Sequence, residues 1–172
     1  LAPVAAPVPP DELQAEIDSL PAEEHLLYTH KSTGLQIYTA QGSRIPRLLH
    51  EIGVQREITF RSVGEGSGSA CDTDEYDQYY DHLIMWDPAE KRIAGAYRMG
   101  RTDSIVTSRG ITGIYNTEFF TFGNKFVNHV KNGLEMGRAF ITAAYQKHPA
   151  SLDTLWMGIG HFVLKYPQYR YR

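Results

Sequence analysis

The sequence contains a single cysteine, Cys71, among its 172 residues, so no disulfide can form within the chain. A lone cysteine fits a reducing compartment best. No apolar run approaches the roughly 18 residues that a membrane-spanning helix requires. The first ten residues also lack the basic and apolar regions of a signal peptide. These absences together predict a cytoplasmic protein.

Several motifs that define common enzyme classes are also missing. No His-x-x-x-His or Cys-x-x-Cys spacing supports a zinc site, and the acidic stretch over residues 71–81 lacks the pattern of a calcium loop. The chain contains no Gly-x-Ser-x-Gly elbow and no Gly-x-Gly-x-x-Gly dinucleotide fingerprint. We therefore expect no metal and no bound cofactor. The net charge of −3 gives no argument for nucleic acid.

The composition is that of an ordinary globular domain, with 42% hydrophobic and 22% charged residues. A chain of this length suits one domain over residues 11–172. Residues 1–10 contain four prolines and predict an extended linker. We expect a further domain before this linker, and a fold that is cut short at its C-terminal end.

Apolar periodicity and capping residues predict alternating strands and helices, and hence an α/β domain. Ser43 and Ser151 are the predicted N-caps of two of the helices. A short aromatic helix or strand is expected over residues 115–122. The other predicted elements are helices over residues 11–20, 44–60, 126–130 and 152–165, hairpins over residues 25–39 and 82–100, and a strand over residues 132–145.

The strand over residues 132–145 is predicted to be central and carries two ionisable residues, Glu135 and Arg138. Residues three apart point to opposite faces of a strand unless a bulge at Gly137 re-aims one of them. Charges in a central strand are costly unless they are paired or used. From spacing alone, a structural Glu135–Arg138 ion pair and a functional site are equally supported.

Other charged residues could complete such a site. Arg56 and Phe60 lie one turn apart on a predicted helix, where the arginine either reaches the rim or enters a cleft. The glycine-rich stretch over residues 63–69 predicts a mobile loop, with a substrate lid as the alternative. The acidic residues that follow it, among them Asp74 and Asp77, could bind a cationic amine.

The order of these motifs resembles the acyl-homoserine-lactone synthases. The shared spacings are Arg56-x-x-x-Phe60, Asp74-x-x-Asp77, Gly95-x-x-Arg98 and Glu135-x-x-Arg138. The residues within and around these motifs resemble even more those of related enzymes, the ornithine-lipid-type and hemolysin-like N-acyltransferases of the GNAT fold. Five blocks carry that likeness, at residues 56–66, 82–87, 95–98, 134–138 and 155–160. The resemblance covers roughly residues 44–170.

The resemblance implies a GNAT-like α/β fold with a mixed, mostly antiparallel sheet flanked by helices. It also implies N-acylation, in which a (3-hydroxy)fatty acyl group passes from a thioester to the amine of an amino acid such as ornithine. Glu135 is then the candidate base, and Arg138 orients it or binds the acceptor's carboxylate. The implied substrate-binding residues are Arg56, Phe60, Asp74, Asp77 and Arg98, although each Asp and Arg could instead only lock the loop to the sheet.

The donor-binding loop of GNAT enzymes would fall at residues 146–151, with Gln146, Lys147 and Ser151 as donor-binding candidates. Pro149 and Ser151 stand where the family has two glycines, and proline removes a backbone donor for a pyrophosphate. This departure favours acyl carrier protein over coenzyme A. Because that carrier is acidic, its docking site should be basic. The candidates for docking are Arg44, Arg47, Lys147 and Lys165.

Two alternatives share the same residues. One is acyl-homoserine-lactone synthesis, and the other is a non-catalytic GNAT-like module that binds carrier protein or lipid. In the hemolysin-like family such domains often follow a phospholipid acyltransferase-like domain, which would suit the proline-rich start. Lipid products favour peripheral contact with the membrane, but the sequence shows no basic amphipathic anchor.

Overall fold

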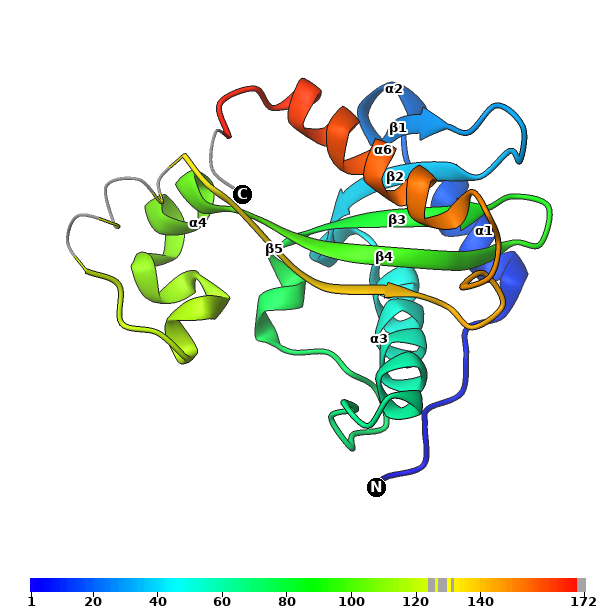
Figure 1. The fold of residues 1–172 in the computed structure, drawn as a ribbon, viewed down its shortest axis with the longest axis horizontal. Helices are drawn as coiled ribbons and strands as arrows, with labels where there is room; N and C mark the ends of the chain where they lie inside the picture. Colours follow the sequence, from blue (N-terminus) through cyan, green and yellow to red (C-terminus); the bar gives the residue numbers. More distant parts are fainter. Residues whose placement is uncertain (124–125, 127–129, 131, 170–172) are drawn as a thin grey trace.

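One five-stranded antiparallel sheet organises the protein, in a computed structural model that describes residues 1–123, 126, 130 and 132–169 (Figure 1). The strands follow one another across the sheet in chain order, and every neighbouring pair is antiparallel. The predicted α/β fold with a mostly antiparallel sheet is confirmed. The strands are β1 (Leu26–Thr29), β2 (Gln36–Gln41), β3 (Asp81–Asp87), β4 (Arg92–Arg101) and β5 (Leu134–Ile141).

Helices cover both faces of this sheet (Figure 1). Helices α1 (Pro10–Asp18) and α3 (Pro46–Ser62) pack on one face, and α6 (Ser151–Lys165) packs on the other. The other α-helices of the described residues are α2 (Ala22–His25) and α4 (Thr102–Arg109), and single 3₁₀ turns are η1 (Gly42–Arg44), η2 (Glu75–Gln78), η3 (Ile111–Gly113) and η4 (Tyr115–Glu118). Among the described residues, no helix combines the length and apolar character needed to cross a membrane.

Strand β3 lies between the two larger apolar clusters of the described structure. Ile84 and Trp86 face α1 and α3, whereas Leu83 and Met85 face α6, because successive side chains of a strand point to opposite faces. All four side chains are fully buried. A strand covered on both faces has no need for polar alternation, which explains the continuous apolar run at residues 83–86.

Both predicted helix caps are wrong. Ser43 belongs to η1, and α3 begins at Pro46, a residue preferred at the first helical position. The carboxylate of Glu16, on α1, accepts from the N–H groups of Arg47 and Leu48 and so replaces a local cap. Ser151 is the first residue of α6 rather than its cap, and its buried Oγ has no hydrogen-bond partner in the described structure.

The strand predicted to be central forms one edge of the described sheet. Strand β5 pairs only with β4 among the described residues. The predicted aromatic element at residues 115–122 contains the short 3₁₀ turn η4. The predicted helix over residues 126–130 lies largely outside the described residues. Elsewhere, both predicted hairpins and the helices at residues 11–20, 44–60 and 152–165 are confirmed within a few residues.

A buried carboxylate organises the glycine-rich loop. Glu57, on α3, accepts from the Ser67 N–H at 3.0 Å, the Ser67 hydroxyl at 2.6 Å and the Gly68 N–H at 2.9 Å. The Arg61 guanidinium donates to the same group at 2.5 Å. The loop in turn accepts the Ala2 N–H at the Gly68 carbonyl, so the N-terminal segment runs beside it.

We expect the Glu57→Gln variant to lose part of the acid sensitivity of folding. Burial raises the Glu57 pKa, but the hydrogen bonds from Ser67, Arg61 and Gly68 outweigh it and lower the pKa from 4.5 to about 2. A lowered pKa stabilises the folded state above about pH 4.5, and this stabilisation is lost as the pH falls towards 2. Free energies of unfolding measured by urea titration over this range should therefore fall more steeply for the wild type than for Glu57→Gln. Equal slopes would contradict the assignment.

Candidate functional site

A chain of buried charges links α3, η2 and β4. The Arg56 guanidinium lies 3.2 Å from the Asp77 carboxylate, and the Arg98 guanidinium lies 3.3 Å from the same carboxylate. Arg56, Asp77 and Arg98 are only 1%, 0% and 2% exposed, respectively. Arg56 therefore neither reaches the rim nor lies in an open cleft. Its ion pair with Asp77 fixes the acidic loop to α3.

Asp74 links this group of buried charges to β5, because it accepts hydrogen bonds from both Arg98 and Arg138. The Arg98 guanidinium donates to both Asp74 oxygens, at 2.7 and 2.8 Å. Arg138 donates to Asp74 at 3.4 Å and to Asp72 at 2.5 Å. Asp74 and Asp77 also cap the backbone of η2 reciprocally, so that each carboxylate bonds the other's N–H group. The structure thus brings together five of the predicted polar site residues, Arg56, Asp74, Asp77, Arg98 and Arg138, and adds Asp72.

The electrostatics of the cluster keep its buried acid ionised. Burial alone raises the pKa of Asp77, but Arg56 and Arg98 more than offset this and hold the pKa below its usual value. His82, fully buried beside them, has its pKa lowered to about 4, first by burial and then by the neighbouring arginines against the pull of Asp77. Its imidazole is therefore neutral at pH 7 and donates Nε2–H to the Asp77 carbonyl at 2.9 Å.

Glu135 bonds to different partners and forms no ion pair with Arg138. Its carboxylate accepts the Tyr80 hydroxyl, the Asn116 N–H at 2.8 Å and the Tyr115 N–H at 3.3 Å. A carboxylate has about four lone-pair sites, so these three bonds leave one available. Burial and the Glu135 carboxylate together raise the pKa of Tyr80, which therefore stays protonated. The structural ion pair that spacing alone suggested is absent.

A bulge in β5 allows Glu135 and Arg138 to contact different partners. The pairing of β4 with β5 slips by one residue between Ala96–Phe140 and Arg98–Gly137. The positive φ belongs to Arg138, at 51°, and not to Gly137. The predicted bulge is therefore present, but the strained backbone is that of Arg138, a candidate site residue. This geometry directs Arg138 towards Asp72 and Asp74.

A small cavity of about 80 Å³ opens beside Glu135. Arg98 and Tyr115 flank it, with the Arg98 guanidinium 4.5 Å from the centre of the Tyr115 ring. Arg138 also donates to the Tyr115 hydroxyl at 3.2 Å. The cavity is lined by Tyr80, Arg98, Tyr115, Asn116, Glu135, Met136 and Gly137. This arrangement places a carboxylate that can take a proton beside guanidinium groups that can hold an anion.

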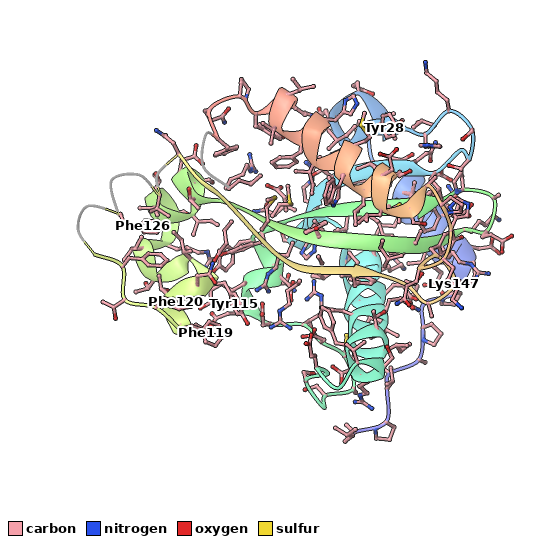
Figure 2. The ribbon with its side chains drawn as sticks, in the orientation of Figure 1. Tyr28, Tyr115, Phe119, Phe120, Phe126 and Lys147 are labelled. Atoms are coloured by element: carbon pink, nitrogen blue, oxygen red, sulfur yellow. The ribbon has the colours of Figure 1, made fainter. Side chains whose placement is uncertain are left out.

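Sequence reasoning missed Tyr80, Tyr115 and Asn116. The density of tyrosines among the acidic residues at 72–81 was the available signal for Tyr80. Tyr115 and Asn116 reach the cavity only through the fold, because the segment between β4 and β5 returns over the edge of the sheet (Figure 2). Their backbone N–H groups, which any residue would supply, make the contacts to Glu135.

Four predicted residues belong neither to this cavity nor to the charged cluster. Phe60 packs against the apolar cluster between the sheet and α1 and α3. Gln146 and Lys147 are exposed in the turn before α6, and Lys147 lies on the opposite side of the molecule from Tyr115 (Figure 2). Ser151 is buried at the start of α6, where the Thr154 hydroxyl also lacks a partner in the described structure. Within the described chain, no cluster of His, Cys, Asp and Glu is suited to hold a metal ion.

We expect Gly42→Ala to destabilise the fold by displacing Asp77. A Cβ at Gly42 would lie 1.8 Å from the backbone oxygen of Asp77, and backbone cannot rotate away as a side chain can. Overpacking of this kind costs about 1–3 kcal/mol. Gly160→Ala, at an exposed position of α6 where a Cβ would meet no neighbouring atom, should instead stabilise the protein by about 0.5–1 kcal/mol. Chemical denaturation of both variants tests this opposite pair of signs.

Comparisons with known proteins show which family this sequence matches. The model of the acetyltransferase (GNAT) domain matches residues 55–157, which include Arg56, Asp77, Arg98 and Glu135. Two proteins named glycine N(alpha)-acyltransferase, from Bacteroides thetaiotaomicron and Phocaeicola vulgatus, are 34% and 32% identical over 98% of this chain. The chain spans about half the length of these relatives, 52% and 54%, and no solved structure matches. The chain belongs to the GNAT acetyltransferase domain family.

Proposed function

We propose that this domain catalyses N-acylation, the transfer of a fatty acyl group from a thioester to the amine of a small amino acid. The observation that carries the proposal is the cavity that Glu135 and Arg98 both line. Family membership supports the reaction class, and the names of the two relatives favour glycine as the acceptor. Ornithine, which the motif resemblance suggests, is the second candidate.

Glu135 is the proposed base. An amine must lose a proton to attack a thioester, and a positioned carboxylate can accept it directly or through a water molecule. The bonds from Tyr80, Tyr115 and Asn116 hold the carboxylate in one orientation and leave one lone pair for the substrate. No covalent enzyme intermediate is required, so Cys71 has no role in the reaction.

The proposed acceptor site discriminates by size and charge. Arg138 is 23% exposed in its side chain, unlike the buried Arg56, and can bind the acceptor's carboxylate. A cavity of about 80 Å³ favours an acceptor without a side chain. Asp77 has no exposed surface, which favours its locking role over contact with the ammonium group. Asp74, 27% exposed, is the acid that could reach that group.

Strand β5 also offers donors for the thioester. An edge strand presents unpaired N–H groups on its outer side, and these can stabilise the oxyanion of the tetrahedral intermediate. For the donor itself we propose acyl carrier protein, because Pro149 removes an N–H group from the loop at residues 146–151 that a pyrophosphate would use. Peripheral contact with the membrane, and attachment to a phospholipid acyltransferase-like domain, belong to the same proposal.

Product analysis by mass spectrometry tests the reaction, the acceptor and the donor together. The full-length protein is incubated with a 3-hydroxyacyl group on carrier protein or on coenzyme A, and with glycine, ornithine or S-adenosylmethionine. We expect N-acylglycine from the carrier-protein thioester. Equal turnover with coenzyme A would overturn the donor assignment, and an acyl-homoserine lactone would overturn the acceptor. No product with any pair would favour a non-catalytic module.

A further inference from the structure

A second and larger cavity, of about 260 Å³, lies on the face of the sheet that α6 covers. It opens where β2 and β4 end and β3 begins, between α2 and the C-terminal end of α6. Asp81 lines it and pairs across the sheet with Met99, whose side chain packs under α6. The adjacent His82 and Arg98 face the opposite side, in the charged cluster described above. The cavity is therefore separate from the proposed acyl-transfer site.

One set of groups around this cavity can hold a negative charge. The Arg101 guanidinium donates Nε–H to Asp81 at 2.6 Å, and no other described residue accepts from its two amino groups. Arg44 is exposed and has no hydrogen-bond partner within the described chain. Lys165 donates to the Glu24 carbonyl and has two further N–H groups available. Arg44 and Lys165, two of the basic residues singled out from the sequence, thus meet at one site.

A second set can hold a positive charge. His25 donates Nδ1–H to the Thr39 carbonyl at 2.6 Å, so Nε2 of the neutral ring is an acceptor. This atom is buried without a hydrogen-bond partner in the described structure, and the nearest carboxylate, on Glu24, is 3.8 Å away. The Thr39 hydroxyl is likewise buried and unpartnered. Leaving such buried groups without a partner is unfavourable, and a bound hydrogen-bond donor would remove that cost.

We propose that this cavity binds a free α-amino acid as a zwitterion. Its carboxylate meets Arg44, Lys165 and the amino groups of Arg101, and its ammonium meets His25 Nε2 and the carboxylate of Glu24. A phosphate would satisfy the first set but would lie against the carboxylates of Glu24 and Asp81. A simple amine would satisfy the second set and leave Arg44 and Lys165 without a counter-charge, since Arg101 is paired with Asp81. Only a ligand with both charges uses both sets.

Strand β4 connects this cavity to the proposed acyl-transfer site, because it carries residues of both. Arg101 lines the cavity, and Arg98 lies three residues earlier on the same strand, in the charged cluster. Binding at the cavity does not depend on the proposed acyl transfer, because the two sites share no lining residue. An amino-acid ligand at this position would let the protein sense the pool from which an acceptor is drawn.

Amide NMR spectra of the full-length, deuterated protein test the proposal and separate the two sites. Glycine, alanine and serine are titrated in turn, with acetate, ethylamine and inorganic phosphate as single-charge probes. We expect saturable shifts of the Ala40 and Gln41 amide signals, which report on the cavity, with each amino acid binding at least about tenfold more tightly than any single-charge probe. Shifts confined to Asn116 and Gly137 would report the acyl-transfer site alone and would overturn the proposal.

Two variants with the same loss of charge serve as test and control. Arg44→Gln should weaken the amino-acid affinity measured at Ala40 by at least about fivefold, because it removes one of the carboxylate's partners. Lys31→Gln should leave this affinity unchanged, since Lys31 is exposed in the turn at the far end of β2. Phosphate binding as tightly as alanine would identify an anion site and refute the zwitterion. Equal affinity in the two variants would do the same.

Discussion

Replacing Asp77 by alanine is expected to lower the free energy of unfolding by about 3–5 kcal/mol, the cost of breaking a buried ion pair. The Asp77 carboxylate accepts from Arg56 and from the Asp74 N–H group, and Arg98 lies 3.3 Å away. Its removal leaves two buried guanidinium groups without their shared counter-charge. Urea denaturation followed by circular dichroism measures the change.

An exposed ion pair of the same chain provides the control for Asp77→Ala. Glu90 accepts from Arg92 at 3.0 Å, and both side chains are more than half exposed. Exposed pairs contribute about 0–1 kcal/mol, so Glu90→Ala should change the free energy of unfolding by no more than that. Comparable losses in the two variants would show that burial of the Arg56–Asp77 pair carries no special cost. The double variant Arg56→Met with Asp77→Leu should recover much of the stability lost in Asp77→Ala, because it removes both charges.

Glu135→Gln is expected to reduce kcat for N-acylation by about 10²–10⁴-fold, the usual contribution of a general base. Glutamine keeps the shape of the side chain and one acceptor oxygen but cannot take up the proton of the amine. The unfolding free energy should change far less than the rate does. The measurement is the steady-state rate of product formation with the carrier-protein thioester and glycine.

Glu118→Gln is the matched control for Glu135→Gln. Its carboxylate also accepts a hydrogen bond from a tyrosine hydroxyl, that of Tyr76, at 2.9 Å. Glu118 does not line the cavity beside Glu135, so its variant should keep the wild-type kcat. Tyr80→Phe gives a third comparison, because it removes a bond to Glu135 and keeps the carboxylate. If Tyr80→Phe and Glu135→Gln lost activity equally, Glu135 would act through position alone and not as a base.

The sequence predicted most of the local structure. Turn residues and apolar alternation located both hairpins, and apolar spacing located α3 and α6. The helix caps failed because the cap of α3 comes from another helix: Glu16 lies 31 residues before the Arg47 N–H group that it bonds. A contact at that separation leaves no signal in the spacing of neighbouring residues. The position of β5 at the sheet edge was missed because an apolar run does not tell which strands lie beside it.

The sequence by itself determined the family-like order of charged residues and the strand, hairpin and helix segments that carry them. Only the tertiary structure decided how the charges combine. Spacing alone left a Glu135–Arg138 ion pair and a functional site equally supported. In the folded domain Glu135 bonds to Tyr80, Tyr115 and Asn116, and Arg138 bonds to Asp72 and Asp74. The physical reason is that a charge in a folded domain is satisfied by whichever donors and acceptors packing brings within about 3 Å. Those partners come from other elements, more often than from neighbours along the chain.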